Sequence, residues 1–266
     1  MKSIKILSFG ALFLVAAATL TAFMTVRVGK KTAVNDKGFA VVELFTSEGC
    51  SSCPPADELV AKIQKEDTDK PVYILAFHVD YWNRLGWKDV FSNADYSKRQ
   101  NDYANFLHLQ SVYTPQIVVD GKTEFVGSEE STLRAAIHNS LQKTSIAQLS
   151  LDIIKTSKND VGLKYDVSGN YNNSILQIAL VQKWAQTKVE RGENGGRTLA
   201  HAQIVRKLQS ATLNANSGKT TIALPSNFDP ASWEIIGFVQ NSTNGVISAA
   251  AKVSFLGEEN AQKNSR

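Results

Sequence analysis

The chain has 266 residues, of which 43% are hydrophobic and 20% charged, and it contains only two cysteines. This composition is typical of a globular protein, and it excludes a disordered chain, a collagen-like chain and a small domain held by several disulfides. The net charge of +4 invites a nucleic-acid or membrane-surface partner. However, residues 1–31 contain five basic and no acidic side chains, which leaves 24 basic and 25 acidic ones in the rest. We therefore expect no nucleic-acid partner.

The N-terminal segment has the pattern of an export signal. Lys2 and Lys5 precede an uncharged, mostly apolar run over residues 6–26. A cleaved signal peptide has this order, but a helix of such length measures about 31 Å and also spans a bilayer. Residues 1–31 are thus expected to be a signal peptide or an uncleaved anchor, with membrane contact only through residues 6–26 in the second case. Either way, we expect the bulk of the protein to be extracytoplasmic, either periplasmic or secreted.

From Phe39 onward, short β-branched apolar runs alternate with stretches of helical spacing. Asp120-Gly121 predicts a hairpin. Strands are expected over 39–45, 72–79, 115–119 and 123–126, and helices over 54–63, 94–108 and 131–142. The order β-α-β-α-β-β-α predicts an α/β domain over residues 38–144.

After residue 144 the helical spacing gives way to short runs separated by Gly, Asn and Ser. Such runs predict strands joined by turns. The expected strands cover 148–154, 161–167, 174–184, 220–224, 233–240 and 246–255. This pattern predicts a mostly antiparallel, sandwich-like all-β domain over residues 145–256, followed by a polar tail over residues 257–266.

The two cysteines, Cys50 and Cys53, stand where the first expected strand gives way to the first expected helix. Free N–H groups and the dipole at a helix N-terminus stabilise a thiolate, so Cys50 is the predicted nucleophile. Cys53 is the predicted resolving thiol, which closes the disulfide and releases the substrate. An exposed pair in oxidising surroundings cycles or stays a disulfide. The pair therefore predicts a thiol–disulfide oxidoreductase that acts on thiols and disulfides of proteins or small molecules, with no cofactor.

Other interpretations of the pair stay open. A structural disulfide in a non-catalytic binding module is one, although so small a loop constrains the unfolded chain little. A site for copper or another soft metal, held by both thiolates with or without His78, is another. A zinc site needs further ligands, and a second cysteine pair is missing from the sequence.

The tripeptide Tyr113-Thr-Pro115 lies directly before the third expected strand. Together with the element order and the cysteine pair at the first strand–helix junction, it resembles the thioredoxin fold. The resemblance implies that Pro115 is a cis proline packed against the disulfide, and that Tyr113 and Thr114 lie beside it where substrate docks. A trans proline that starts a strand is the alternative. The dipeptide between the cysteines and the longer stretch after Val79 differ from thioredoxin itself.

Four motifs carry a closer resemblance. They are Glu48–Asp57, His78–Asp89, Val112–Gln116 and Arg191–Leu199. Together they resemble a secreted thioredoxin-like family known as domain of unknown function 1223. The resemblance implies a thioredoxin-like domain and an exported protein, but no established reaction.

The motif that follows the second expected strand supplies candidate rim residues. Cys50 follows the first strand and His78 ends the second, so they are expected to share the edge where ligands bind an open parallel sheet. His78 or Asp80 is a candidate proton acceptor during exchange. Trp82 and Trp87 are candidates for an apolar groove. The alternatives are a hydrogen-bonded core histidine and indoles that merely pack the insertion.

A charged, glycine-rich loop supplies the last candidates. Arg191, Arg197 and His201 are expected to bind an anion, or the loop, with Glu193, folds over the redox site. Salt bridges between domains are the alternative. The sequence does not predict a metal-ligand set.

Overall fold

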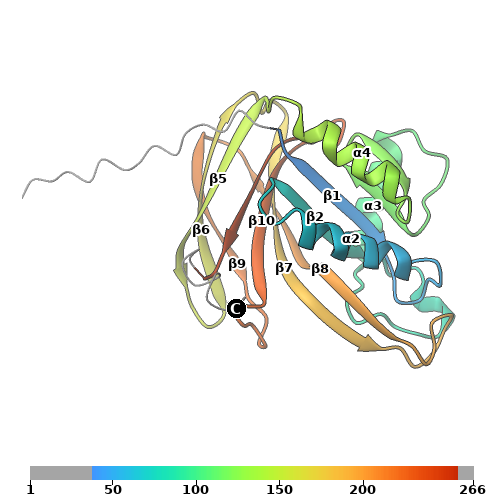
Figure 1. The fold of residues 1–266 in the computed structure, drawn as a ribbon. Coiled ribbons are helices and arrows are strands. Elements are labelled where there is room, and N and C mark those ends of the chain that lie inside the picture. The colour runs from blue at the N-terminus through green and yellow to red at the C-terminus, as the bar shows by residue number, and fades with distance from the viewer. Residues whose placement is uncertain (1–37, 257–266) are drawn as a thin grey trace, which may run out of the picture. The chain divides into compact units, whose positions relative to one another are not determined.

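One eight-stranded mixed sheet takes its strands from both halves of the chain (Figure 1). The structure is a computed structural model that describes residues 38–256, so the predicted signal or anchor segment 1–31 and the tail 257–266 lie outside the described residues. The strands are β1 (Ala40–Thr46), β2 (Val72–His78), β3 (Gln116–Val119), β4 (Thr123–Val126), β5 (Ala147–Thr156), β6 (Asp160–Gly169), β7 (Ser174–Lys188), β8 (Thr198–Thr212), β9 (Ser217–Ala223), β10 (Trp233–Asn241) and β11 (Ile247–Ser254). The helices are α2 (Pro54–Glu66), α3 (Ala94–Phe106), α4 (Glu130–Leu141) and a short 3-10 helix, η1 (Asn83–Leu85).

The large sheet has the order β11-β10-β7-β8-β2-β1-β3-β4, and a three-stranded sheet has the order β5-β6-β9. In the large sheet β2 lies parallel to both β1 and β8. The other neighbouring pairs are antiparallel. Among residues 38–256, no helix combines the length and the apolar character that a membrane crossing requires.

Alternation along β1 separates two cores, because successive side chains of a strand point to opposite faces. Val42 and Leu44 pack with α2 and α4 on one face. Val41 and Phe45 pack on the other face, where Tyr96 and other residues of α3 lie. A third core joins the β5-β6-β9 sheet to β7, β10 and β11. Figure 1 shows α2 and α4 in front of β1 and α3 behind it.

The expected fold class, a thioredoxin-like α/β domain followed by an all-β sandwich-like domain, is wrong. The described chain is mostly β, with three α-helices, and strands from before and after residue 145 share the large sheet. The junction is the parallel pair β2–β8, where Ala76 lies opposite Ile204. The expected boundary near residue 145 therefore does not separate two sheets.

Strand β8 is the element that the sequence pattern does not predict. Its first half is buried, but His201 and Gln203 are among the buried residues, and polar side chains also fill its second half. No apolar alternation of period two therefore appears along it. Its partners β7 and β2 supply the hydrogen bonds and the apolar surfaces that make it a strand.

Candidate functional site

The cysteine pair forms a disulfide at the junction of β1 and α2. Cys50 and Cys53 are bonded, with their Cα atoms 5.4 Å apart. Both residues are fully buried, whereas Ser51 and Ser52 between them are exposed. The disulfide itself is therefore covered, and only the two serines between the cysteines reach the surface.

The start of α2 offers few free N–H groups to stabilise a thiolate. Pro54 and Pro55 occupy the first two helical positions and have no N–H. The N–H groups of Ala56 and Asp57 both donate to the carbonyl oxygen of Cys53. The Ser52 hydroxyl contacts the Cys50 sulfur, with 3.4 Å between Oγ and Sγ. A Cys50 thiolate would thus rely on this hydroxyl and on the helix dipole.

The predicted shared edge of β1 and β2 is confirmed by their register. Thr46, the last residue of β1, lies opposite His78, the last residue of β2. His78 is fully buried, and its Nδ1 lies 2.7 Å from Oδ2 of the buried Asp89. Burial by itself raises the pKa of Asp89, but His78 and two backbone N–H groups bring it below its usual range.

Asp80 does not join this group. Its carboxylate accepts a hydrogen bond from the hydroxyl of Ser97, and the Ser97 hydroxyl in turn accepts one from the N–H of Asp80. Ser97 belongs to α3, which covers the sheet face opposite to α2. Of the two candidate proton acceptors, only His78 therefore lies with the buried groups near the disulfide.

The Tyr113-Thr-Pro115 segment lies against the start of α2. The Thr114–Pro115 peptide bond is cis. A Cβ placed on Gly127 would come 3.0 Å from Cβ of Pro115 and 3.1 Å from Cβ of Ala56, so these two residues lie side by side. Thr114 accepts a hydrogen bond from the indole of Trp82 at 2.8 Å. The Tyr113 hydroxyl donates to Glu124 instead, so the Tyr113 side chain is held by β4.

The two tryptophans lie on either side of η1 in the β2–α3 connection and have separate hydrogen-bond partners. Trp82 binds Thr114, and its Cβ would lie 3.0 Å from a Cβ placed on Gly49, next to Cys50. Trp87 donates to Oε2 of Glu48 at 2.7 Å. Both indoles are therefore tied by hydrogen bonds, which favours a bracing role over an open apolar groove.

The tip of the β7–β8 hairpin covers the cysteine turn. Oε2 of Glu193 accepts a hydrogen bond from the N–H of Ser51 at 2.9 Å. The side-chain amide of the buried Asn194 donates to the carbonyl oxygens of Glu48 and Cys50, both at 2.9 Å. Arg197 in turn donates to Oδ1 of Asn194. Figure 1 shows the long β7–β8 hairpin reaching the end of the structure where α2 begins.

The expected anion site of Arg191, Arg197 and His201 is not formed. Arg191 and Arg197 are exposed, whereas His201 is 1% exposed on β8. His201 Nδ1 lies 3.3 Å from Oδ1 of Asp57, and its Nε2 lies 3.6 Å from Oε1 of Glu48. Burial by itself lowers the pKa of His201, but hydrogen bonds to these two carboxylates raise it to about 10.

Sequence reasoning missed four buried residues of this site, namely Glu48, Asp57, Asp89 and Asn194. Each lies inside one of the motifs that carry the family resemblance. The available signal was the density of carboxylate and amide side chains in otherwise apolar or glycine-rich segments. It was not decisive, since the partners are up to 146 residues apart in the chain.

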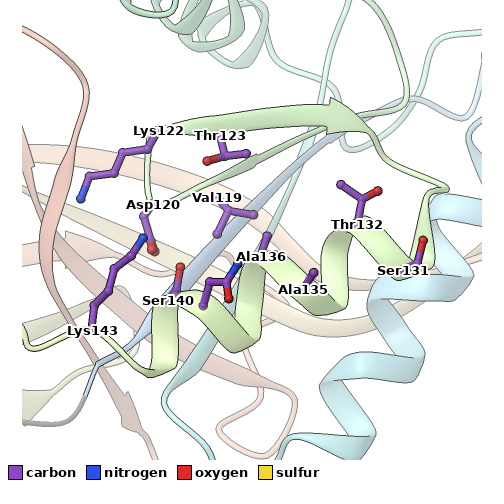
Figure 2. Close-up of a pocket in the computed structure, with 11 residues that line it drawn as sticks. Val119, Asp120, Lys122, Thr123, Ser131, Thr132, Ala135, Ala136, Ser140 and Lys143 are labelled. Atoms are coloured by element: carbon purple, nitrogen blue, oxygen red, sulfur yellow. The ribbon is translucent and has the colours of Figure 1, made fainter.

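A surface pocket of about 480 Å³ lies elsewhere, between the β3–β4 hairpin and α4 (Figure 2). Thr132 and Ser131 lie at one end of it, and Asp120, Lys122 and Lys143 at the other. The cysteines and histidines of the site do not line it.

Comparisons with known proteins agree with the architecture. A protein from Agrobacterium tumefaciens of known crystal structure is 25% identical in sequence, and the match covers 82% of this chain and 95% of that one, with a TM-score of 0.61. HBP35 of Porphyromonas gingivalis is 17% identical, with 82% and 75% covered and a TM-score of 0.58, which shows a shared fold. A search of curated proteins gives no match. Residues 41–240 match the family described as "Protein of unknown function (DUF1223)". The chain therefore belongs to the DUF1223 family.

Proposed function

We propose that this protein is an exported thiol–disulfide oxidoreductase that uses the two-cysteine chemistry of thioredoxin-like proteins. The observation that carries the proposal is the Cys50–Cys53 disulfide at the first turn of α2, next to Pro115. The sequence contains no other cysteine. Its substrates would be thiols or disulfides of proteins or small molecules.

The exchange proceeds in two balanced steps. In the reduced protein, the Cys50 thiolate attacks a sulfur of the substrate disulfide. The Cys50–substrate bond forms, the substrate S–S bond breaks, and the leaving thiolate takes up a proton. The Cys53 thiolate then attacks the Cys50 sulfur, which restores the protein disulfide and releases the second substrate thiol. The substrate is reduced and the protein oxidised, and the reverse sequence oxidises a substrate dithiol.

Access to the sulfurs requires the hairpin tip to move, because both cysteines are buried in the closed state. Three hydrogen bonds hold the tip, one from Ser51 to Glu193 and two from Asn194 to backbone carbonyls. Glu193 is exposed and its bond is open to water. We propose that the tip opens before exchange, and that Thr114 and Pro115 then form the edge at which the substrate docks.

An extracytoplasmic location is part of the proposal. It is supported by the positive, apolar N-terminal segment and by the nearly neutral charge of the rest of the chain. A disulfide formed by the two cysteines also persists more readily outside the reducing cytoplasm.

Two single variants test the proposed roles of the cysteines. Cys53→Ser keeps the attacking thiol and removes the resolving one, so it is expected to accumulate a mixed disulfide with oxidised glutathione. Cys50→Ser keeps only Cys53 and is expected to form much less of it. Mass spectrometry of the intact protein counts the adduct directly. Equal inertness of both variants and of the reduced wild type at every redox potential tested would remove the redox proposal.

A structural disulfide in a non-catalytic binding module is the second candidate. The complete burial of both sulfurs under the hairpin tip favours it. For this candidate, reduction of the wild type by glutathione buffers is expected only together with global unfolding. Reduction of the folded protein, followed by near-ultraviolet circular dichroism, is the outcome that would favour the redox couple instead.

A further inference from the structure

Two histidines and an aspartate converge beneath the cysteine turn. Asp57 of α2, His78 of β2 and His201 of β8 are all buried, and one donor atom of each lies within 4.8 Å of the other two. His78 and His201 contact each other, with ring centroids 4.8 Å apart. The three residues come from three elements and meet only because β8 pairs with β2. We infer that Asp57, His78 and His201 form a binding site for one divalent transition-metal ion.

The unpartnered Nε2 of the buried His78 points to a ligand. His78 Nδ1 is taken by Asp89, which leaves Nε2 as the free nitrogen, and this atom is buried without a hydrogen-bond partner. His201 Nδ1 is hydrogen-bonded to Oδ1 of Asp57 at 3.3 Å, a contact that a bound ion would replace. Two ligands of a tetrahedral ion with bonds of about 2.0–2.1 Å lie about 3.4 Å apart. This pair thus already has the spacing of two ligands, and His78 offers the third donor atom within 4.8 Å of both.

The residues around the three ligands are those that a metal site needs. The outer nitrogen of each histidine faces a buried carboxylate, Asp89 at 2.7 Å from His78 and Glu48 at 3.6 Å from His201. Such carboxylates orient ligating histidines and raise their basicity. The second oxygen of Asp57 accepts a hydrogen bond from the Thr46 hydroxyl at 2.8 Å.

Charge and solvent exclusion support the same conclusion. Glu48, Asp57 and Asp89 are three carboxylates buried within one cluster. Buried carboxylates require compensating positive charge, and a divalent cation would supply it. The ring of Phe91 packs edge-on against both imidazoles, at 5.1 Å and 5.6 Å between centroids, and keeps water away from them.

The donor set selects the class of metal. Imidazole nitrogens combined with one carboxylate suit Zn²⁺, Fe²⁺, Cu²⁺ and Ni²⁺, whereas Mg²⁺ and Ca²⁺ prefer sites made of oxygen ligands. The thiolates are not needed, since both sulfurs are held in the disulfide. The inferred site therefore differs from a copper site built on Cys50 and Cys53, and it does not depend on whether these cysteines turn over.

The test uses Zn²⁺ as the probe and the oxidised full-length protein, purified without a polyhistidine tag. We expect one Zn²⁺ per chain by titration against a chromophoric chelator, and a visible spectrum of a nitrogen- and oxygen-ligated ion with Co²⁺. His78→Gln and His201→Gln are each expected to weaken Zn²⁺ binding by more than about 100-fold. Asp89→Asn, which only loosens the support of His78, is expected to weaken it by about 10- to 100-fold.

The chain offers a matched control, because its two other histidines, His108 and His138, are exposed. The double variant His108→Ala/His138→Ala is expected to bind Zn²⁺ as the wild type does. The variant Cys50→Ser/Cys53→Ser is also expected to bind it, which separates this site from the thiols and its test from that of the redox proposal.

Three results would overturn the inference. They are the absence of stoichiometric Zn²⁺ binding by the wild type, retention of binding by a folded His78→Gln or His201→Gln protein, and loss of binding in the surface double variant. Near-ultraviolet circular dichroism establishes whether each variant is folded. If a buried-histidine variant does not fold, Asp57→Asn and Asp89→Asn decide, and unchanged affinity in both overturns the inference.

Discussion

Asn194, at the tip of the β7–β8 hairpin, donates a hydrogen bond to the carbonyl oxygen of Cys50 at 2.9 Å. The two residues are 144 positions apart in the chain. The contact ties the hairpin tip to the disulfide that it covers, so we expect the stability of this tip to control access to the sulfurs. The same amide group also holds the carbonyl oxygen of Glu48.

The substitution Asn194→Ala is expected to speed reduction of the disulfide. It removes both hydrogen bonds and leaves two carbonyls unpaired in the closed state, which costs about 1–3 kcal/mol. We therefore expect about tenfold faster reduction by excess phosphine reductant, measured by alkylation and mass spectrometry. Asn139→Ala, which changes an exposed asparagine of α4, is the control and should leave the rate unchanged. A wild-type rate in the Asn194 variant would mean that the tip does not limit access.

Low pH is expected to weaken the contact between the hairpin tip and the cysteine turn by protonating Glu193. Hydrogen bonds from the hydroxyl and the N–H of Ser51 hold the pKa of Glu193 below its usual range. A lowered pKa in the folded state means that the stabilisation is complete above the ordinary pKa of the carboxyl group and is lost as the pH falls through the lowered value. The rate at which phosphine reduces the wild type, divided by the rate for Glu193→Gln, should therefore rise below about pH 4. A ratio that is constant between pH 3 and pH 6 contradicts this role.

The buried ion pair between Arg99 and Glu43 is expected to be a major determinant of stability. Arg99 of α3 donates two hydrogen bonds to the carboxylate of Glu43 on β1, at 2.6 Å and 2.8 Å. Glu43→Gln removes one charge and leaves the buried guanidinium without its partner, which costs about 3–5 kcal/mol. Urea unfolding measures this change. The exposed neighbouring pair supplies the control, since Lys98→Ala removes an ion pair with Asp102 and should cost less than about 1 kcal/mol.

The hydroxyl of Ser52 is expected to assist the proposed Cys50 thiolate. It lies 3.4 Å from the Cys50 sulfur, and a hydrogen bond of this kind contributes about 0.5–1.5 kcal/mol. Ser52→Ala should therefore raise the pKa of the Cys50 thiol in the reduced protein by about 0.4–1 unit, measured by the pH dependence of alkylation. Ser242→Ala, at an exposed serine remote in sequence, should have no effect. An unchanged thiol pKa in Ser52→Ala would exclude this contribution.

The sequence predicted the local elements of the first part well, because each is encoded by its own residues. The apolar run of β1, the prolines that open α2 and the Asp120-Gly121 turn are signals that depend only on neighbours in the chain. The shared edge of Cys50 and His78 also followed, since parallel neighbouring strands end on the same side of a sheet. The fold class was wrong for one reason above all, which is that β8 is recognisable only from its partners.

By itself, then, the sequence determined the position of the cysteine pair at the β1–α2 junction and the concentration of excess positive charge in residues 1–31. Only the tertiary structure decided that the pair is buried under Asn194 and that His201 reaches His78 and Asp57. The physical reason is that hydrogen bonds of buried polar groups are satisfied by whichever residues the sheet brings close. The pairing of β8 with β2 sets these contacts, and no pattern of near neighbours in the chain encodes it.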